Sequence, residues 1–214
     1  SFLADHNTAT GEQSRVSLED GSVAYLNTDT AINVSFDATG RRIDLLRGEA
    51  FFEVSRDPER PFAVVAHGGH SVAIGTAYAV RSDFASGETA VTVQEGVVAV
   101  RSGAADGAES VVRASQQVRY SGKAGQGPVT GIDLEDVLAW RRGLISFEGR
   151  PMSEAVEEID RYMPGMILLL NGEVRDEAVT ATLAIKSLDD GLQALAATQN
   201  LSVHKVSPYL TLLY

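Results

Sequence analysis

The chain has 214 residues, with 18 Lys and Arg against 29 Asp and Glu, a formal net charge of −11 and no cysteine. This length allows one or two domains. The acidic balance disfavours binding to nucleic acid or to anionic membrane, since both are negatively charged, and the lack of cysteine excludes a disulfide framework and thiol chemistry.

The first 14 residues are polar and carry few strand signals, so they predict a loose leader before the first domain. No signal peptide is visible. No apolar run reaches the roughly 18–20 residues that a membrane helix needs. Since the chain begins at Ser1-Phe2 without a methionine, we interpret it as an excised soluble region.

Residues 15–140 contain short β runs that often begin at a glycine, without the fixed period of a strict repeat. Ala50, Phe52 and Val54 alternate with other residues after Gly48, which predicts a turn followed by a strand with one buried face. Pro61 cannot donate to a strand ladder, so it predicts a strand start or an edge. This part is therefore expected to be an all-β domain.

After a junction at residues 141–149, the pattern changes to alternating strands and helices, and residues 144–214 are expected to form an α+β domain. Acidic residues at the start of 133–140 favour a short helix, and apolar residues at helical spacing predict an amphipathic helix over 151–162. Ser187, followed by Asp190, predicts another helix start. Strands are expected at 144–147, 166–170, 179–184, 201–203 and 209–213.

Several linked motifs resemble the FecR family, the periplasmic portions of bacterial anti-sigma regulators. The motifs are Leu18-Glu19-Asp20-Gly21-Ser22-Val23, Arg47-Gly48-Glu49-Ala50-Phe51-Phe52-Glu53-Val54, Arg60-Pro61-Phe62, Ile74-Gly75-Thr76-Ala77-Tyr78-Ala79-Val80 and Ala139-Trp140-Arg141-Arg142-Gly143. The resemblance covers roughly residues 15–143, with Tyr78 where Phe is usual. It implies a twisted, solenoid-like β core, preceded in the whole protein by a cytoplasmic sigma-binding segment and one transmembrane helix.

Residues 144–214 more loosely resemble the STN module of signalling TonB-dependent transporters and secretins. The likeness rests on two β-α-β units, on the opening from Ile145 to Met152 and on the late Gly191-Leu192-Gln193-Ala194-Leu195. Together, the two resemblances imply a periplasmic region that binds the signalling domain of an outer-membrane siderophore transporter. That contact would alter proteolysis of the regulator and control a sigma factor. The alternative from another class is a carbohydrate-binding or hydrolytic β-domain of the cell envelope.

The sequence contains no motif of a common enzyme class: no G-x-S-x-G, no P-loop and no G-x-G-x-x-G. His67 and His70 provide at most half of a zinc site, so we expect a turn there, and neither a metal nor a cofactor. We therefore expect function through protein contact and not through turnover.

The bond between Gly75 and Thr76 is the one place where covalent chemistry is conceivable. A threonine hydroxyl can attack the preceding carbonyl, and glycine leaves that carbonyl sterically open. Some FecR-like regulators are processed at a matching bond, so the resemblance implies a possible self-cleavage here. The competing interpretation is that Gly75 turns the chain and Thr76 begins a strand.

We expect the partner to dock on residues 144–214, at an exposed strand edge, because a small sheet has edges that are hard to cover. The predicted contact residues are Val179, Thr180, Ala181, Thr182, Leu183, Tyr209, Leu210, Thr211 and Leu212. The alternative is that both strands are internal and that the partner contacts the helix at 151–162. Trp140 is expected to be buried where the two parts of the chain join.

Overall fold

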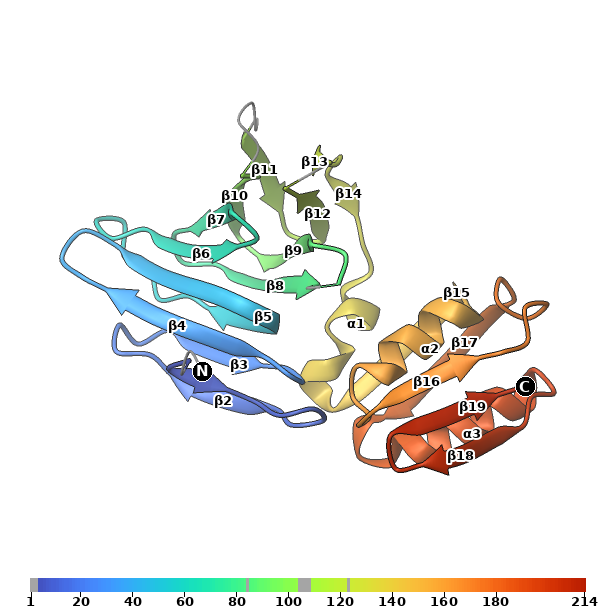
Figure 1. The fold of residues 1–214 in the computed structure, drawn as a ribbon. Coiled ribbons are helices and arrows are strands. Elements are labelled where there is room, and N and C mark those ends of the chain that lie inside the picture. The colour runs from blue at the N-terminus through green and yellow to red at the C-terminus, as the bar shows by residue number, and fades with distance from the viewer. Residues whose placement is uncertain (1–3, 84, 104–108, 123) are drawn as a thin grey trace. The chain divides into compact units, whose positions relative to one another are not determined.

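The structure, a computed structural model, describes residues 4–83, 85–103, 109–122 and 124–214 (Figure 1). The chain divides into two compact units, one up to Asp133 and one from Leu134 onward. The division precedes the expected boundary at residue 140. None of the described helices combines the length and the apolar character that crossing a membrane requires.

The first unit is mainly β, as expected, and in the described residues fourteen strands are hydrogen-bonded into one curled sheet (Figure 1). The strands are β1 (His6–Asn7), β2 (Ser14–Ser17), β3 (Val23–Leu26), β4 (Ala31–Phe36), β5 (Arg41–Glu53), β6 (Phe62–Ala66), β7 (Gly69–Ala73), β8 (Ala77–Asp83), β9 (Glu88–Glu95), β10 (Val97–Arg101), β11 (Glu109–Arg113), β12 (Gln116–Ser121), β13 (Gly125–Gln126) and β14 (Thr130–Gly131).

Strand β5 connects the two halves of this sheet. Its first part pairs with β4 and β6, and its second part pairs with β3 and β8. Gly48 lies where the partners change, at φ 83°, and a Cβ placed there would lie 2.4 Å from the hydroxyl of Thr30. The prediction of a turn at Gly48 was wrong, because the strand continues through it, but the left-handed backbone does require glycine.

The inward faces of the two halves form one apolar core. Phe52 contacts both Phe62 and Tyr78, with ring centroids 5.6 and 5.8 Å apart. The alternation read from the sequence correctly placed Ala50 and Phe52 in the core. The expectation of a single buried face was wrong, because Glu49 and Phe51 on the other face are also buried. Pro61 directly precedes β6, which confirms the expected strand start.

The prediction that residues 1–14 form a loose leader was wrong for the part that begins at His6. His6 and Asn7 pair with β4, and Thr8 is buried, with its hydroxyl donating to the carbonyl of Asn27 at 2.6 Å. Polar side chains gave no strand signal there, because this segment is fixed by hydrogen bonds and not by apolar burial. Residues 1–3 of the leader lie outside the described residues.

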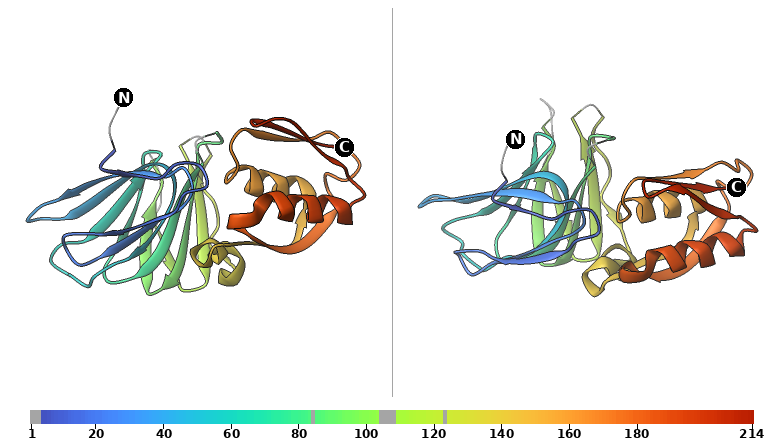
Figure 2. Two further views of the ribbon diagram at one scale, coloured as in Figure 1. Left: turned by 90° about the horizontal axis from the view of Figure 1, so that it is seen from below. Right: turned by 60° about the horizontal axis from the view of Figure 1, so that its bottom comes forward.

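The second unit has two sheets with two helices between them (Figure 2). Helices α2 and α3 each contact a strand of both sheets. Its elements are α1 (Leu134–Val137), the 3₁₀ helix η1 (Ala139–Arg142), β15 (Leu144–Pro151), α2 (Met152–Asp160), β16 (Met166–Leu169), β17 (Ala178–Ala184), η2 (Ile185–Ser187), α3 (Leu188–Thr198), β18 (Val203–Ser207) and β19 (Leu210–Leu213).

The elements expected in this unit are present, except that the strand expected at 201–203 instead spans 203–207. Their pairing is not that of simple β-α-β units. β15 and β17 form an antiparallel two-stranded sheet. β16 lies parallel to β19 in a three-stranded sheet with the order β16-β19-β18. The strands on either side of α2 therefore belong to different sheets. Trp140 is buried, as expected, within η1.

Candidate functional site

A polar recess of about 430 Å³ lies beside the bond between Gly75 and Thr76. The strand registers explain its composition, since Glu53 of β5 and Glu95 of β9 both lie opposite Ala77 of β8. Pairing across three strands places these two carboxylates on one face, on either side of a small side chain. The recess is lined by Gly21, Val23, Glu53, Val54, Ser55, Gly75, Thr76, Ala77, Gln94 and Glu95.

Thr76 has an unusual environment for a strand-end threonine. It is only 6% exposed, and its hydroxyl has no hydrogen-bond partner among the described residues. Leaving a buried hydroxyl unsatisfied costs about 1–3 kcal/mol. The main chain at Thr76 is held, because its carbonyl accepts from the N–H of Val54 at 2.9 Å. The main chain at Thr76 is therefore fixed, whereas its hydroxyl has no hydrogen-bond partner among the described residues.

Gly75 has φ 72°, and a Cβ at this position would lie 3.0 Å from Cβ of Arg56. The predicted turn is confirmed, and Thr76 immediately precedes β8. The backbone at Gly75 fits the turn interpretation, and the unsatisfied hydroxyl on the adjacent Thr76 is compatible with the self-cleavage interpretation.

The segment that packs on Gly75 is fixed by a buried ion pair. The guanidinium of Arg41 donates to the carboxylate of Asp20 at 2.6 Å and to the carbonyls of Ser55 and Arg60, both at 2.8 Å. Burial alone would raise the pKa of Asp20, but hydrogen bonds from Ser22 and Arg41 outweigh it and lower that pKa. The Asp-Gly-Ser motif therefore joins Arg41 in holding the loop at residues 55–60.

His67 lies in a turn, as expected. Its Nδ1 is 3.2 Å from the hydroxyl of Thr89 and 3.4 Å from that of Ser82. His70 faces Arg101 across the β7–β10 pair. Within the part of the chain that the structure describes, no group of three or more His, Cys, Asp or Glu could hold a metal ion.

A second recess of about 430 Å³ is lined by Asp5, His6, Ser17, Leu18, Glu19, Val34, Ser35 and Phe36. It contains carboxylates and an aromatic ring, as a sugar site would. However, the Asp5 carboxylate accepts from the N–H of Val34 at 2.8 Å, and the ring of Phe36 packs edge-on against Phe62. Both groups therefore have structural roles in the fold.

The predicted partner-binding residues lie on two different strands with different surroundings. In β17, Val179 and Leu183 are buried, whereas Thr180 and Thr182 are exposed. β17 pairs only with β15 among the described strands, so its other edge is open, as expected. The expected edge at 209–213 was wrong, because β19 is the central strand of its sheet.

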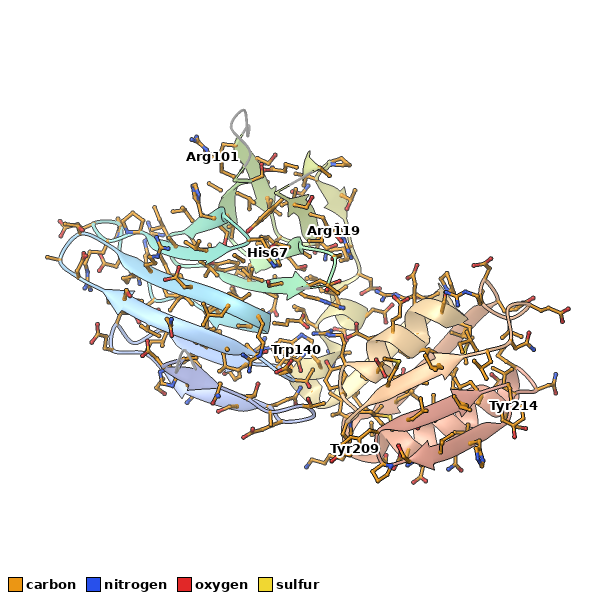
Figure 3. All side chains as sticks on the ribbon, viewed as in Figure 1. His67, Arg101, Arg119, Trp140, Tyr209 and Tyr214 are labelled. Carbon is orange, nitrogen blue, oxygen red and sulfur yellow. The ribbon has the colours of Figure 1, made fainter. Side chains whose placement is uncertain are left out.

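The prediction of an edge strand at 209–213 failed because the order of strands in a sheet depends on pairing between segments that are distant in the sequence. Met166 pairs with Leu210 and Leu169 with Leu213, in parallel. Nothing in the 209–213 segment itself distinguishes a central strand from an edge. Tyr209 and Tyr214 lie at the two ends of this strand (Figure 3) and are 70% and 56% exposed.

Comparison with known proteins identifies a family domain within the first unit. Residues 4–99 match the model of the FecR protein family. No curated protein matches the chain.

Two crystal structures of a candidate anti-sigma factor from Parabacteroides distasonis, at 1.65 and 2.50 Å resolution, have a similar fold. The first is 26% identical, with a TM-score of 0.84 over 99% of each chain. The second is 25% identical, with a TM-score of 0.82 over 98% of this chain and 97% of the other. The FecR resemblance is thereby confirmed for a domain in the first unit, while the STN resemblance of the second unit stays a prediction.

Proposed function

We propose that this chain, which carries a FecR domain, is the periplasmic region of a transmembrane anti-sigma regulator. The observation that carries the proposal is the likeness to a candidate anti-sigma factor over 99% of both chains. The FecR domain at residues 4–99 supports the same signalling role. Function in this proposal is contact between proteins and not turnover of a substrate.

In this function the second unit receives the signal. It binds the signalling domain of a TonB-dependent outer-membrane siderophore transporter. The contact changes how periplasmic and membrane proteases act on the whole regulator, which controls a sigma factor through a cytoplasmic segment. The support is architectural, since the second unit is a small domain with open sheet edges of the kind that other chains use for docking.

The test is calorimetric titration of the full chain with the signalling domain of a transporter encoded beside it. Saturable binding at one partner per chain is expected. Fragments 1–133 and 134–214, once each is shown to be folded, then locate the contact. Binding retained only by 1–133 would move the site to the FecR domain, and no binding by the full chain would contradict the proposed partner.

A second proposal is self-cleavage between Gly75 and Thr76, favoured by the unsatisfied hydroxyl of Thr76. The Thr76 oxygen attacks the Gly75 carbonyl carbon, the peptide C–N bond breaks, and the hydroxyl proton passes to the released amine. Water then hydrolyses the ester, which leaves a carboxylate on Gly75 and restores the hydroxyl of Thr76. Glu95 lines the same recess and could accept a proton there.

This proposal is tested by intact mass spectrometry of purified protein over several days at neutral pH. The wild type should split into two fragments at this bond, and hydroxylamine should accelerate the split because it attacks esters. Thr76→Ala should abolish cleavage, whereas Thr76→Ser retains a nucleophile and should still cleave. A wild-type chain that keeps its intact mass under both conditions would overturn the proposal.

A further inference from the structure

Apolar side chains are concentrated on the outer face of the three-stranded sheet in the second unit. Six of the ten large hydrophobic residues exposed in the described chain lie on its strands or at their ends. They are Met166, Leu168, Leu170, Val206, Tyr209 and Tyr214. Monomeric proteins rarely expose a contiguous apolar patch of more than a few hundred Å² without a functional reason.

The strand register makes this patch continuous. Met166 lies directly opposite Leu210, and Leu168 lies opposite Leu212. Paired residues project from the same face, so the half-buried Leu210 and Leu212 fill the space between the exposed residues of β16 and the far strand β18. The opposite face contains the buried Ile167 and Leu213 and covers the helices. Alternation along β16 and β19 continues this face through Leu170 and Tyr214, so we define the outer-face patch as Met166, Leu168, Leu170, Leu210, Leu212 and Tyr214.

The other sheet of the same unit provides an internal comparison. Its outer face on β17 presents small and polar residues, among them Thr180 and Thr182. This is the usual pattern for a sheet with one face in water. The two sheets cover the same helices but differ in the residues on their outer faces. Only the outer face of the three-stranded sheet is apolar, as the core of a protein interface is.

Both edges of the three-stranded sheet have features that disfavour pairing with a further strand. At β16, the N–H of Ile167 donates to the carboxylate of Asp160 at 2.6 Å, so this backbone donor is already used. At β18, the register shifts between Lys205 and Ser207. An irregular strand and an edge lysine both discourage the pairing of a further strand. A partner of this sheet therefore meets its face and not its edge.

Charge indicates which kind of partner fits. Residues 134–214 contain twelve acidic and seven basic side chains, and the whole chain has a net charge of −11. A second copy of the chain carries the same net negative charge, and like charges across an interface disfavour association. A partner with an apolar centre and a basic rim is favoured instead.

We propose that the outer-face patch is the docking surface for a partner protein domain that presents an apolar face bordered by basic side chains. This inference rests on the proposed function and specifies which surface of the second unit makes the contact. Tyr214 lies at the end of β19 (Figure 3), and exposed tyrosines often contribute strongly to such contacts. Leu210 and Leu212 are then contacted through their side chains and not through their backbone.

The experiment compares two double variants of the full chain in calorimetric titrations with the transporter signalling domain. Met166→Thr with Leu168→Thr removes apolar surface from the patch and keeps β propensity. Val97→Thr with Val111→Thr is the matched control, since these residues are 49% and 43% exposed on the first unit. The patch variant should bind at least about tenfold more weakly, which corresponds to about 1.4 kcal/mol, and the control should bind like the wild type.

Amide chemical shifts recorded during the same titration give a readout that needs no variant. Shifts concentrated at residues 166–170 and 209–214 are expected. Binding that is equally strong in both variants, with shifts concentrated at 178–184, would overturn the surface while the proposed function stands. No binding by the wild type would overturn both.

Sedimentation of the free chain distinguishes a second copy from a different partner. A monomer is expected at micromolar concentration. A wild-type dimer that becomes monomeric in the patch variant would show that the patch binds another copy of the chain, and would contradict the basic-rimmed partner. Matching thermal unfolding curves for the variants and the wild type exclude loss of fold as the cause of weaker binding.

Discussion

The guanidinium of Arg41 is fully buried, and its partner Asp20 is almost as deeply buried. Taking two charges out of water costs several kcal/mol per ion, and the cost is offset only where both are well hydrogen-bonded. Here the carboxylate also accepts from the N–H of Ser22 at 3.0 Å, and the guanidinium also donates to main-chain carbonyls. Removing one partner therefore leaves a charge that the fold cannot solvate.

Asp20→Asn is accordingly expected to lower the free energy of unfolding of the first unit by about 3–5 kcal/mol. The matched control is Asp44→Asn, which removes an ion pair with Arg42 whose side chain is 56% exposed. Exposed pairs contribute at most about 1 kcal/mol. Urea unfolding of the two variants measures the difference, and equal losses would contradict the structural role of the buried pair.

The same pair predicts a dependence of stability on pH. The pKa of Asp20 is lower in the folded chain than its ordinary value, so the folded state binds a proton less readily than the unfolded state. The stabilisation is present above the unfolded pKa of about 3.9 and is lost as the pH falls through the folded pKa. Urea unfolding between pH 6 and pH 3 should show a steeper loss in the wild type than in Asp20→Asn. Parallel profiles would contradict this.

Among the elements, β5 depends on one residue without a side chain. Gly48→Ala combines a left-handed backbone with a Cβ only 2.4 Å from Thr30, so both strain and overlap oppose it. Gly87→Ala is the matched control, because Gly87 has φ 68° but open space around it. We expect a loss of about 1–2 kcal/mol for Gly87→Ala and a clearly larger loss for Gly48→Ala, measured by thermal unfolding. A similar loss in both would show that overlap at Thr30 is relieved without cost.

The elements also show what local sequence can and cannot specify. The apolar period of α2 predicted its buried residues Met152, Ala155 and Ile159, because that pattern acts within the helix itself. The central place of β19 could not be predicted, because it depends on a parallel partner 44 positions earlier in the chain. Similarly, the recess beside Thr76 requires β5, β8 and β9 to be aligned, and no local motif reports that alignment.

At the scale of the whole molecule, the two units have separate cores. The first core lies inside the curled sheet, and the second lies between two sheets and two helices. Fragments 1–133 and 134–214 should therefore each unfold cooperatively, with circular dichroism spectra that add up to that of the full chain. The smaller fragment is expected to be the less stable, because small domains bury a smaller share of their surface. A disordered fragment 134–214 would contradict this independence.

The parallel pairing of β16 with β19 also affects how the chain is made. During synthesis Met166 emerges 44 residues before Leu210, its partner in the sheet. For that interval the wholly apolar segment Met166–Leu170 has no strand beside it, and short apolar segments of this kind are prone to aggregate. The nascent second unit thus passes through a stage at which a ribosome pause, or a cut between Ser207 and Leu210, leaves β16 unpaired. A chaperone that covers residues 166–170 until β19 arrives would raise the yield of folded protein.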